Sequence, residues 1–514
     1  MTDYYDAIVI GAGHNGLVCA TLLAQAGRDV LVLEARDAVG GAACTAEFAD
    51  GYSVSSVAHL LYGLQPEVLN DLGLKPELAA DNLGTIALAE DGAHVRLRGD
   101  VAQGVSDADA AALRTFRSRM RRYAKLLARQ MNRPPPRLGS SARGDLLALA
   151  KLGFDIRRLG RDAMRDFLRI VGMNIYDELE ECFESPRLKG ALALDAVLGT
   201  HLGPRSPNTI LTWLHRHSAN DGRLATPVGG MGNLGERLAD LARGAGATIL
   251  TGSPVQRVVV ENGRATGVET ADGTVYESLT IVSNADPKRT VMDLVGTRHF
   301  ETGFVRRVHN IRMQGNAAKL HLALDGLPAV TGLEKRDFAE RLVVAPDSDY
   351  VERAFNPAKY GEYSPEPVFE IVFPSFRDPT LAPAGKHVLS AIVQYAPHTL
   401  RAGWDDGARA AFERLCLDTL ERYLPGLGKR VTSSELLLPA DIEERYGMSG
   451  GHWHHGELTL DQFLFVRPVG GAAQYALPLD GLYLCGAGAH PGGDVAGAAG
   501  RNAALEILKR GKGA

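Results

Sequence analysis

The sequence predicts an α/β fold with a parallel sheet, and three observations near its start support this. Residues 7–10, Ala-Ile-Val-Ile, have the apolar, β-branched character of a buried parallel strand. Residues 17–26 continue with the apolar pattern of a helix, which Gly27 would end. A second apolar run follows at 29–33. The order strand, helix, strand is the unit from which parallel α/β sheets are built.

Three glycines in G-x-G-x-x-G spacing separate the first strand from the helix. Gly11 permits a tight turn, Gly13 lets the backbone approach a pyrophosphate, and Gly16 lets helix and strand pack closely. The backbone N–H groups at the helix start then meet the phosphate charge. Glu34, at the end of the second strand, can accept from ribose hydroxyls and would repel a 2′-phosphate. These residues predict an adenine dinucleotide without that phosphate.

The loop after the second strand favours FAD over NAD. Residues 34–43, E-A-R-D-A-V-G-G-A-A, resemble the E-x-R-x-x-x-G-G signature of the flavoprotein superfamily that contains amine oxidases and phytoene desaturases. The resemblance implies that Arg36, Gly40 and Gly41 continue the grip on the dinucleotide. Two successive glycines also allow close backbone approach at this second loop.

A second glycine cluster, in residues 482–508, again has the order strand, glycine-rich turn, helix. One interpretation is a second dinucleotide site, for NAD(P)H, but no strand with an acid after it follows. The cluster resembles the C-terminal FAD motif of the phytoene desaturases. This resemblance implies that Gly488, Asp494 and Val495 contact FAD and that the helix start stabilises negative charge on the reduced flavin.

Two internal segments complete the expected cofactor domain. Residues 253–260 resemble the family segment whose backbone meets adenine, which points to Val255. Residues 281–287 resemble the strand end that returns the chain to that domain. The expected fold is α/β: a Rossmann-type FAD-binding domain of the amine oxidase/phytoene desaturase-like kind, assembled from three segments, and a substrate domain of mixed sheet plus helices. The FAD-binding domain would comprise 1–75, 222–295 and 435–514, with a helical insert at 76–221 and a β-rich insert at 296–434.

The β-rich insert contains residues 319–324 and 387–395, which alternate with period two. That pattern is typical of an antiparallel sheet with one face buried. Residues 375–397 and 450–471 resemble the phytoene dehydrogenase-related group that includes pyridine nucleotide-disulphide oxidoreductase domain-containing protein 2. The resemblance covers essentially the whole chain. It implies an FAD-dependent oxidoreductase that transfers a hydride between an apolar or partly apolar small molecule and flavin N5, with oxygen or a quinone as electron acceptor.

Lys319 and His455 are the catalytic candidates. Lys319 resembles the lysine that reaches flavin N5 through a water in flavin amine oxidases, and desolvation there would lower its pKa and suit it to handling protons. The alternative is a strand-end lysine in solvent. His455 matches a histidine of the group's G-G-x-x-x-H stretch, in one block with Asp461, Gln462 and Arg467. It would act as a general acid or bond the substrate, or else bond only the backbone of its loop.

Other histidines receive weaker roles. His452, His454 and His455 lack helical spacing and a nearby cysteine, so no metal site is expected. His59 should pass close to the isoalloxazine, without a defined role, and His490 is expected to bond the cofactor loop. A flavin amine oxidase remains an alternative because of Lys319, although residues 488–497 offer no aromatic side chain for an amine cage. An FAD-stabilised scaffold or chaperone without turnover also remains open.

Composition limits the partners. The 56 Lys and Arg against 61 Asp and Glu give a charge of -5, which argues against nucleic-acid binding. Residues 114–169 nevertheless carry sixteen Lys or Arg and four Asp, a local charge of +12. Peripheral membrane contact through 114–169 is one interpretation. The solvated face of amphipathic helices is the favoured one, because the arginines at 157, 158, 161, 165 and 169 recur every three to four residues.

The five cysteines include no close pair, which excludes a zinc cluster and a local redox disulfide and fits a reducing compartment. The early first strand leaves no room for a targeting peptide, and no apolar run approaches the ~20 residues of a membrane span. The sequence therefore predicts a cytoplasmic protein, or one peripheral at a membrane surface.

Overall fold

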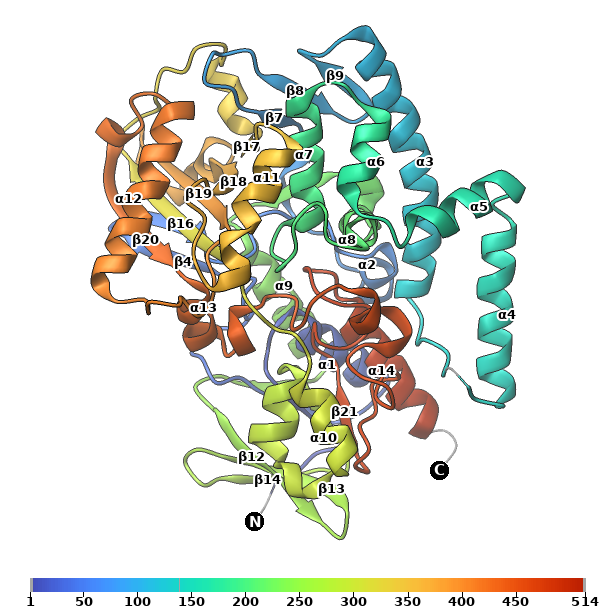
Figure 1. The fold of residues 1–514 in the computed structure, drawn as a ribbon. Helices are drawn as coiled ribbons and strands as arrows, with labels where there is room; N and C mark the ends of the chain where they lie inside the picture. The colour runs from blue at the N-terminus through green and yellow to red at the C-terminus, as the bar shows by residue number, and fades with distance from the viewer. Residues whose placement is uncertain (1–2, 138, 512–514) are drawn as a thin grey trace.

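The computed structural model describes residues 3–137 and 139–511. The structure contains a five-stranded parallel sheet. Its strand order is β11 (Thr248–Leu250), β3 (Val30–Leu33), β2 (Ala7–Ile10), β15 (Ile281–Ser283) and β21 (Leu482–Leu484). Its labelled strand β21 lies in the half of the molecule where both termini are marked (Figure 1). The predicted strands at the start of the chain are confirmed, and every residue of β2 and β3 is buried. The sheet joins strands from three distant parts of the sequence.

Three helices cover this sheet. The helix α1 (His14–Gln25) follows β2 and packs against α9 (Met231–Gly244) and α14 (Ala498–Gly511). Gly27 adopts a φ of 80° immediately after α1, a left-handed conformation that suits glycine at a helix end. A smaller sheet adjoins them, with strand order β1 (Asp3–Tyr4), β14 (Val275–Glu277), β13 (Arg264–Thr270) and β12 (Val255–Glu261).

The two inserts share one eight-stranded sheet. Its strand order is β20 (Val431–Leu437), β16 (Ala317–Leu324), β19 (His387–Gln394), β18 (Val368–Val372), β17 (Arg341–Val344), β7 (Thr85–Ala87), β8 (Val95–Arg98) and β9 (Val101–Gln103). The last three strands come from the insert that the sequence describes only as helical. They join the sheet through a parallel pairing of β7 with β17. Strands of three to four residues between turns leave too little periodic pattern to be recognised in a sequence.

The prediction that the antiparallel sheet buries one face is wrong for β16, because all eight of its residues are buried. One face of β16 carries Leu320 and Leu322, which pack with α12 (Asp406–Tyr423). The other face carries Lys319 and His321, and the ring of His321 lies 3.2 Å from the Ser56 carbonyl. The alternation therefore separates an apolar core from a polar interior that contains Lys319 and His321.

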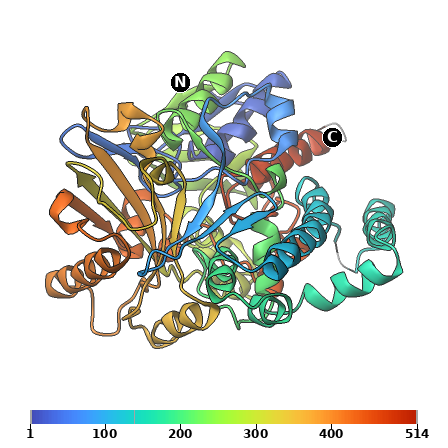
Figure 2. The ribbon, with the colours of Figure 1, turned by 90° about the horizontal axis from the view of Figure 1, so that it is seen from above.

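The helical part of the first insert packs beside this sheet (Figure 2). It comprises α3 (Asp107–Met131), α4 (Arg143–Arg157), α5 (Arg161–Ile170), α6 (Ile175–Cys182), α7 (Pro186–Val197) and α8 (Thr209–Arg216). The pair α4 and α5 projects from the body of the molecule in both views. Among helices of the described residues, none is both long and apolar enough to cross a bilayer.

Shorter elements complete the fold. The remaining helices are α2 (Pro66–Leu72), α10 (Thr302–His309), α11 (Ser348–Phe355) and α13 (Pro439–Tyr446). Two strand pairs are β4 (Thr45–Ala49) with β5 (Tyr52–Ser55), and β10 (Leu224–Pro227) with β6 (Leu78–Leu83). The loop between β5 and α2 brings residues 57–63 to the space between the two large sheets, where the site lies.

Candidate active site

A cavity of about 380 Å³ lies between the five-stranded sheet and the eight-stranded sheet. This volume is within the range of ligand pockets in proteins. The N-terminal glycine loop, the end of β3, the start of β12 and the turn before α14 supply one set of lining residues. The two inserts supply only four: Leu198, Arg216, Glu370 and Ile392.

The glycine loop is shaped for a close ligand. Gly11 has a φ of 93° and Gly41 a φ of 60°, both in the region that favours glycine. A Cβ on Gly41 would stand 3.2 Å from the Cα of Gly13, so two glycine loops touch here. The Glu34 carboxylate accepts from the backbone amides of Ala12 at 2.7 Å and Arg36 at 3.0 Å. This arrangement holds the carboxylate at the cavity wall.

Most of the predicted cofactor residues line the cavity: Gly11, Gly13, Glu34, Arg36, Gly40, Gly41, Val255, Asp494 and Val495. Gly16 and Gly488 do not. A Cβ on Gly16 would stand 2.2 Å from the Gly11 carbonyl oxygen, so this glycine serves the packing of α1 against the loop. A Cβ on Gly488 would meet the Pro287 ring at 2.3 Å. Gly16 and Gly488 therefore affect the cavity through the packing of the segments that line it, and not through direct contact.

The residues present fit FAD. The glycines of the two loops would let the backbone approach the phosphates of FAD, and Glu34 would accept from its ribose hydroxyls. Two buried ring nitrogens beside the cavity, Nε2 of His14 and Nδ1 of His455, have no hydrogen-bond partner in the described residues. Unpartnered polar atoms next to a cavity are expected where a polar ligand supplies the partner.

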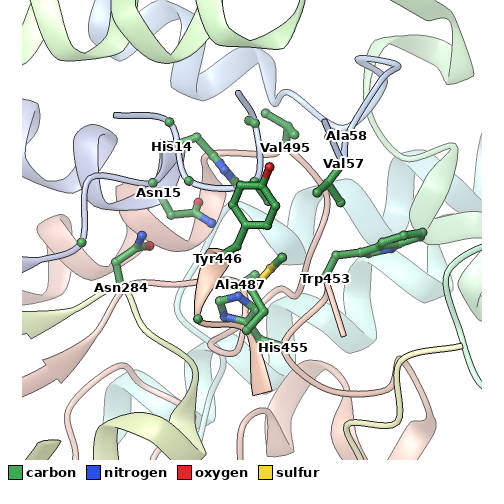
Figure 3. Close-up of a pocket in the computed structure, with 18 of the residues that line it drawn as sticks. His14, Asn15, Val57, Ala58, Asn284, Tyr446, Trp453, His455, Ala487 and Val495 are labelled. Atoms are coloured by element: carbon green, nitrogen blue, oxygen red, sulfur yellow. The ribbon is translucent and has the colours of Figure 1, made fainter. Parts of the chain in front are cut away.

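Sequence reasoning missed several lining side chains, including His14, Asn284, Tyr446 and Trp453 (Figure 3). His14 stands inside the glycine motif, where its position alone could have identified it. Tyr446, the last residue of α13, and Trp453 belong to no motif that carries a chemical meaning. The guanidinium of Arg36 lies 4.9 Å from the centroid of the Tyr446 ring. These aromatic side chains enter the cavity from outside the C-terminal glycine turn.

Lys319 is fully buried and is not among the residues that line the cavity. Its Nζ lies 2.9 Å from Nδ1 of His59 and 2.9 Å from the Ser390 hydroxyl. Burial lowers the pKa of Lys319 to about 7, although the Glu370 carboxylate counteracts this. The expected desolvated lysine is therefore present, but a histidine stands between it and the cavity.

His59 lines the cavity and connects Lys319 to a carboxylate. Its Nε2 lies 3.0 Å from Oε1 of Glu370. Since a carboxylate accepts hydrogen bonds only, Nε2 carries the proton and Nδ1 accepts from Lys319. Burial and the nearby Lys319 lower the pKa of His59 to about 4, so the ring is neutral at pH 7.

Glu370 is the centre of a buried charge cluster. Its Oε2 accepts from Arg216 at 2.7 Å and from Arg341 at 2.6 Å, and Arg341 also bonds Asp195 at 2.6 Å. Burial alone would raise the pKa of Glu370, but Arg216 and Arg341 hold it well below its usual value. The charges that the inserts bring to the cavity thus compensate one another.

Asp494 is compensated in a similar way. Its carboxylate accepts from the Tyr62 hydroxyl at 2.8 Å and lies 3.2 Å from the His215 ring. Burial would raise its pKa, and the hydrogen bond with His215 lowers it below the usual value. Asp494 has a φ of 67°, so the turn before α14 holds this carboxylate in an unusual backbone conformation.

His452, His454 and His455 point to different neighbours. His452 bonds Glu457 at 2.9 Å, His454 lies 3.7 Å from Asp494, and only His455 lines the cavity. In the described residues, no group of three or more potential ligands could hold a metal ion. Burial lowers the pKa of His455 to about 4. A neutral imidazole suits a hydrogen bond better than a general-acid role.

The neighbours of His455 in its block are structural. Buried Arg467 donates to the carbonyl oxygens of Gly456, Glu457 and Ala487, among others, and so holds the loop. Asp461 pairs with Arg312 at the surface, and Gln462 accepts from the Arg312 backbone. His490 contacts the carbonyls of Gln130 and Leu464, and so connects α3 to a neighbouring loop.

Comparisons with known proteins agree with this site. The family described as flavin containing amine oxidoreductase matches residues 16–508. Pyridine nucleotide-disulfide oxidoreductase domain-containing protein 2 of Rattus norvegicus is 34% identical, over 98% of this chain and 93% of that protein. The name of that relative contains the words disulfide oxidoreductase, whereas all five cysteines of this chain are free.

One further relative and one solved structure are similar to this chain. Phytoene desaturase (neurosporene-forming) of Cereibacter sphaeroides is 25% identical, over 97% of this chain and 93% of that protein. The solved structure of cyclohexylamine oxidase from Brevibacterium oxydans superposes with a TM-score of 0.58 at 16% identity, covering 99% of each chain. At this identity the superposition establishes the fold.

Proposed function

The chain belongs to the flavin-containing amine oxidoreductase family and is an FAD-dependent oxidoreductase, and we propose that it transfers a hydride between an apolar or partly apolar small molecule and flavin N5. In this proposal 1–75, 222–295 and 435–514 hold FAD and the two inserts bind the substrate. The cofactor residues would be those predicted from the sequence, with Gly16 and Gly488 acting through packing.

The main support for this proposal is the part of the cavity wall that the two inserts contribute. Leu198 and Ile392 are apolar, and the charges of Arg216 and Glu370 are bonded to each other. Each buried carboxylate of the cavity wall, Glu34, Glu370 and Asp494, already accepts hydrogen bonds from the protein. Since a charged ligand would need an uncompensated partner, this wall favours a substrate with little or no charge.

Bound FAD supplies the hydride chemistry, and the protein supplies orientation and a route for protons. We propose that His455 offers its Nδ1 to a polar group in the cavity. Lys319 would serve as a positioning residue, because it fixes the tautomer of His59 and does not face the cavity. Its pKa of about 7 lets it take or release a proton near neutral pH.

An anaerobic absorbance titration of the purified protein tests the proposal. Apolar alkenes, alcohols and carotenoid precursors form the first series, amines the second, and NADH and NADPH the third. Bleaching of the flavin by an apolar compound, followed by reoxidation with oxygen or a quinone, is the expected result. Rapid bleaching by a nicotinamide would overturn the proposal in favour of a reductase. Bound FAD that no organic compound bleaches would favour a scaffold without turnover.

Amine oxidation is the second candidate. The cavity contains the aromatic side chains Tyr62, Tyr446 and Trp453, which the C-terminal turn by itself does not supply. The compensated carboxylates argue against it, because a protonated amine would find no free buried acid. If the amine series bleaches the flavin and the apolar series does not, amine oxidation replaces the proposal.

A further inference from the structure

The helices α4 and α5 project from the body of the protein and expose large apolar side chains. Leu146, Leu147 and Phe154 on α4 are 51%, 70% and 58% exposed, and Leu168 on α5 is 57% exposed. Asp155 is the only residue of α4 that is buried. A helix that leaves its apolar side chains in water and buries an acid has the reverse of the usual polarity for a solvated surface helix.

The exposed face of α4 also has a uniform charge. At 100° per residue, Leu146, Leu147 and Phe154 fall on one arc of the helix. Four basic residues share this arc and are exposed: Arg143, Lys151, Arg157 and Arg158. In the described residues Arg143, Lys151 and Arg157 form no ion pair, and the Arg158 guanidinium lies 5.9 Å from the centroid of the Phe154 ring.

Both acids of α4 are directed toward the body of the protein. Asp145 accepts from the Arg137 backbone at 3.1 Å and from the Gln474 side chain at 3.3 Å. Asp155 lies 3.6 Å from Arg129 of α3. These contacts anchor α4 on the protein and leave its outer arc with apolar and basic side chains alone.

The basic residues of α3 are used differently. Arg119 pairs with Glu178, Arg121 with Asp100 at 2.6 Å, and Lys125 with Asp221 at 3.2 Å. Part of the local charge of 114–169 is therefore neutralised within the protein. On α5, Arg161 and Arg165 are also exposed, and no ion pair of theirs occurs in the described residues.

We propose that the outer face of α4, with the adjoining Leu168 of α5, docks on a lipid bilayer that carries anionic headgroups. Leucine and phenylalanine side chains would enter the acyl boundary, and the long stems of arginine and lysine would let their charges reach the phosphates. A second copy of this chain is a poor partner, because a two-fold contact would set the same basic face against itself. The projection of both helices from the body leaves the face accessible (Figures 1 and 2).

Vesicle sedimentation of the FAD-loaded protein tests this docking. We expect the protein to sediment with vesicles of phosphatidylcholine mixed with phosphatidylglycerol, and to remain in solution with phosphatidylcholine alone. Raising the salt concentration should weaken binding, since the headgroup attraction is screened. Leu147→Ser/Phe154→Ser should lower the bound fraction about tenfold without changing the melting temperature. Tyr360→Ser is the matched control, because Tyr360 is 72% exposed elsewhere on the surface.

Two further variants test the electrostatic contribution to vesicle binding separately. Lys151→Gln/Arg157→Gln should weaken binding to the anionic vesicles, whereas Arg401→Gln, at an exposed site in the other insert, should not. The docking proposal is overturned if the wild-type protein ignores anionic vesicles or if Leu147→Ser/Phe154→Ser binds them like the wild type. It is also overturned if gel filtration shows a dimer that Leu147→Ser/Phe154→Ser dissociates while vesicles capture neither form.

Discussion

The amine of Lys319 lies 2.9 Å from Nδ1 of His59, and the histidine rather than the lysine faces the cavity. The ring of His59 is held between this amine and the Glu370 carboxylate, which fixes its tautomer. Protonation of Lys319 therefore acts on the cavity through its hydrogen bond to His59.

Replacing Lys319 with methionine should change how stability depends on pH. The pKa of Lys319 is about 7 in the folded protein and near the ordinary lysine value of 10.5 in the unfolded chain. Between these values the unfolded chain binds more protons, so stability rises with pH, by at most about 1.4 kcal/mol per unit. Urea unfolding from pH 7 to 10 should show this rise in the wild type and a flatter curve in Lys319→Met. Exposed Lys386→Met is the control, and equal slopes in all three proteins would contradict the burial of the amine.

Replacing Glu370 with glutamine should destabilise the protein strongly. Arg216 and Arg341 would each lose the Glu370 carboxylate and keep only Asp195 as an ion-pair partner among the described residues. Removing one member of a buried ion pair costs about 3–5 kcal/mol. Urea unfolding of Glu370→Gln measures this loss. Asp461→Asn breaks the exposed pair with Arg312 and should cost about 0–1 kcal/mol. Similar losses in both variants would show that the cluster is not isolated from water.

His455 should affect turnover more than FAD content, because FAD would be held mainly by the glycine loops. Removing one hydrogen bond to the substrate should slow turnover about tenfold. His455 has a φ of 53°, so alanine adds backbone strain, which His455→Gly avoids. Anaerobic flavin reduction should be slow in both variants, and normal reduction in His455→Gly would assign the effect to the backbone. With a pKa of about 4, His455 should give the wild-type profile no inflection between pH 5.5 and 8.

Replacing Gly16 with alanine should weaken FAD binding without touching the cavity. The added Cβ would stand 2.2 Å from the Gly11 carbonyl oxygen, so the loop or α1 must shift. Such overpacking costs about 1–3 kcal/mol. The ratio of absorbance at the flavin band to that of the protein measures the loss. Gly244→Ala near the end of α9 meets no atom within 4 Å and should keep full FAD content. Equal FAD content in both variants would contradict the packing role.

The sequence was sufficient for the cofactor half of the site because its motifs carry their own geometry. Gly11, Gly13 and Glu34 act through backbone conformation and local spacing, and the structure places all three at the cavity. Lys319 was singled out by resemblance; it is buried with a lowered pKa, but His59 and not Lys319 lines the cavity. The roles of Lys319 and His455 in catalysis stay predictions.

The rest depended on contacts between distant segments. His59, Glu370 and Arg216 come from three parts of the chain, and no local pattern indicates that they meet. The two-sided burial of β16 was missed because its alternation is usual for a half-exposed strand, whereas here its polar face meets other polar groups. The exposed apolar side chains of α4 were not recognised because apolar residues in a helical pattern usually mark the buried face.

The order of strands in the five-stranded sheet has a consequence for how this protein is made. β2 and β3 precede both inserts in the chain, whereas the edge strand β21 and the helix α14, which packs on α1, follow both inserts. On a ribosome, the N-terminal segment must remain without these partners while both inserts are translated. The N-terminal glycine loop therefore acquires its complete surroundings only after both inserts have been translated.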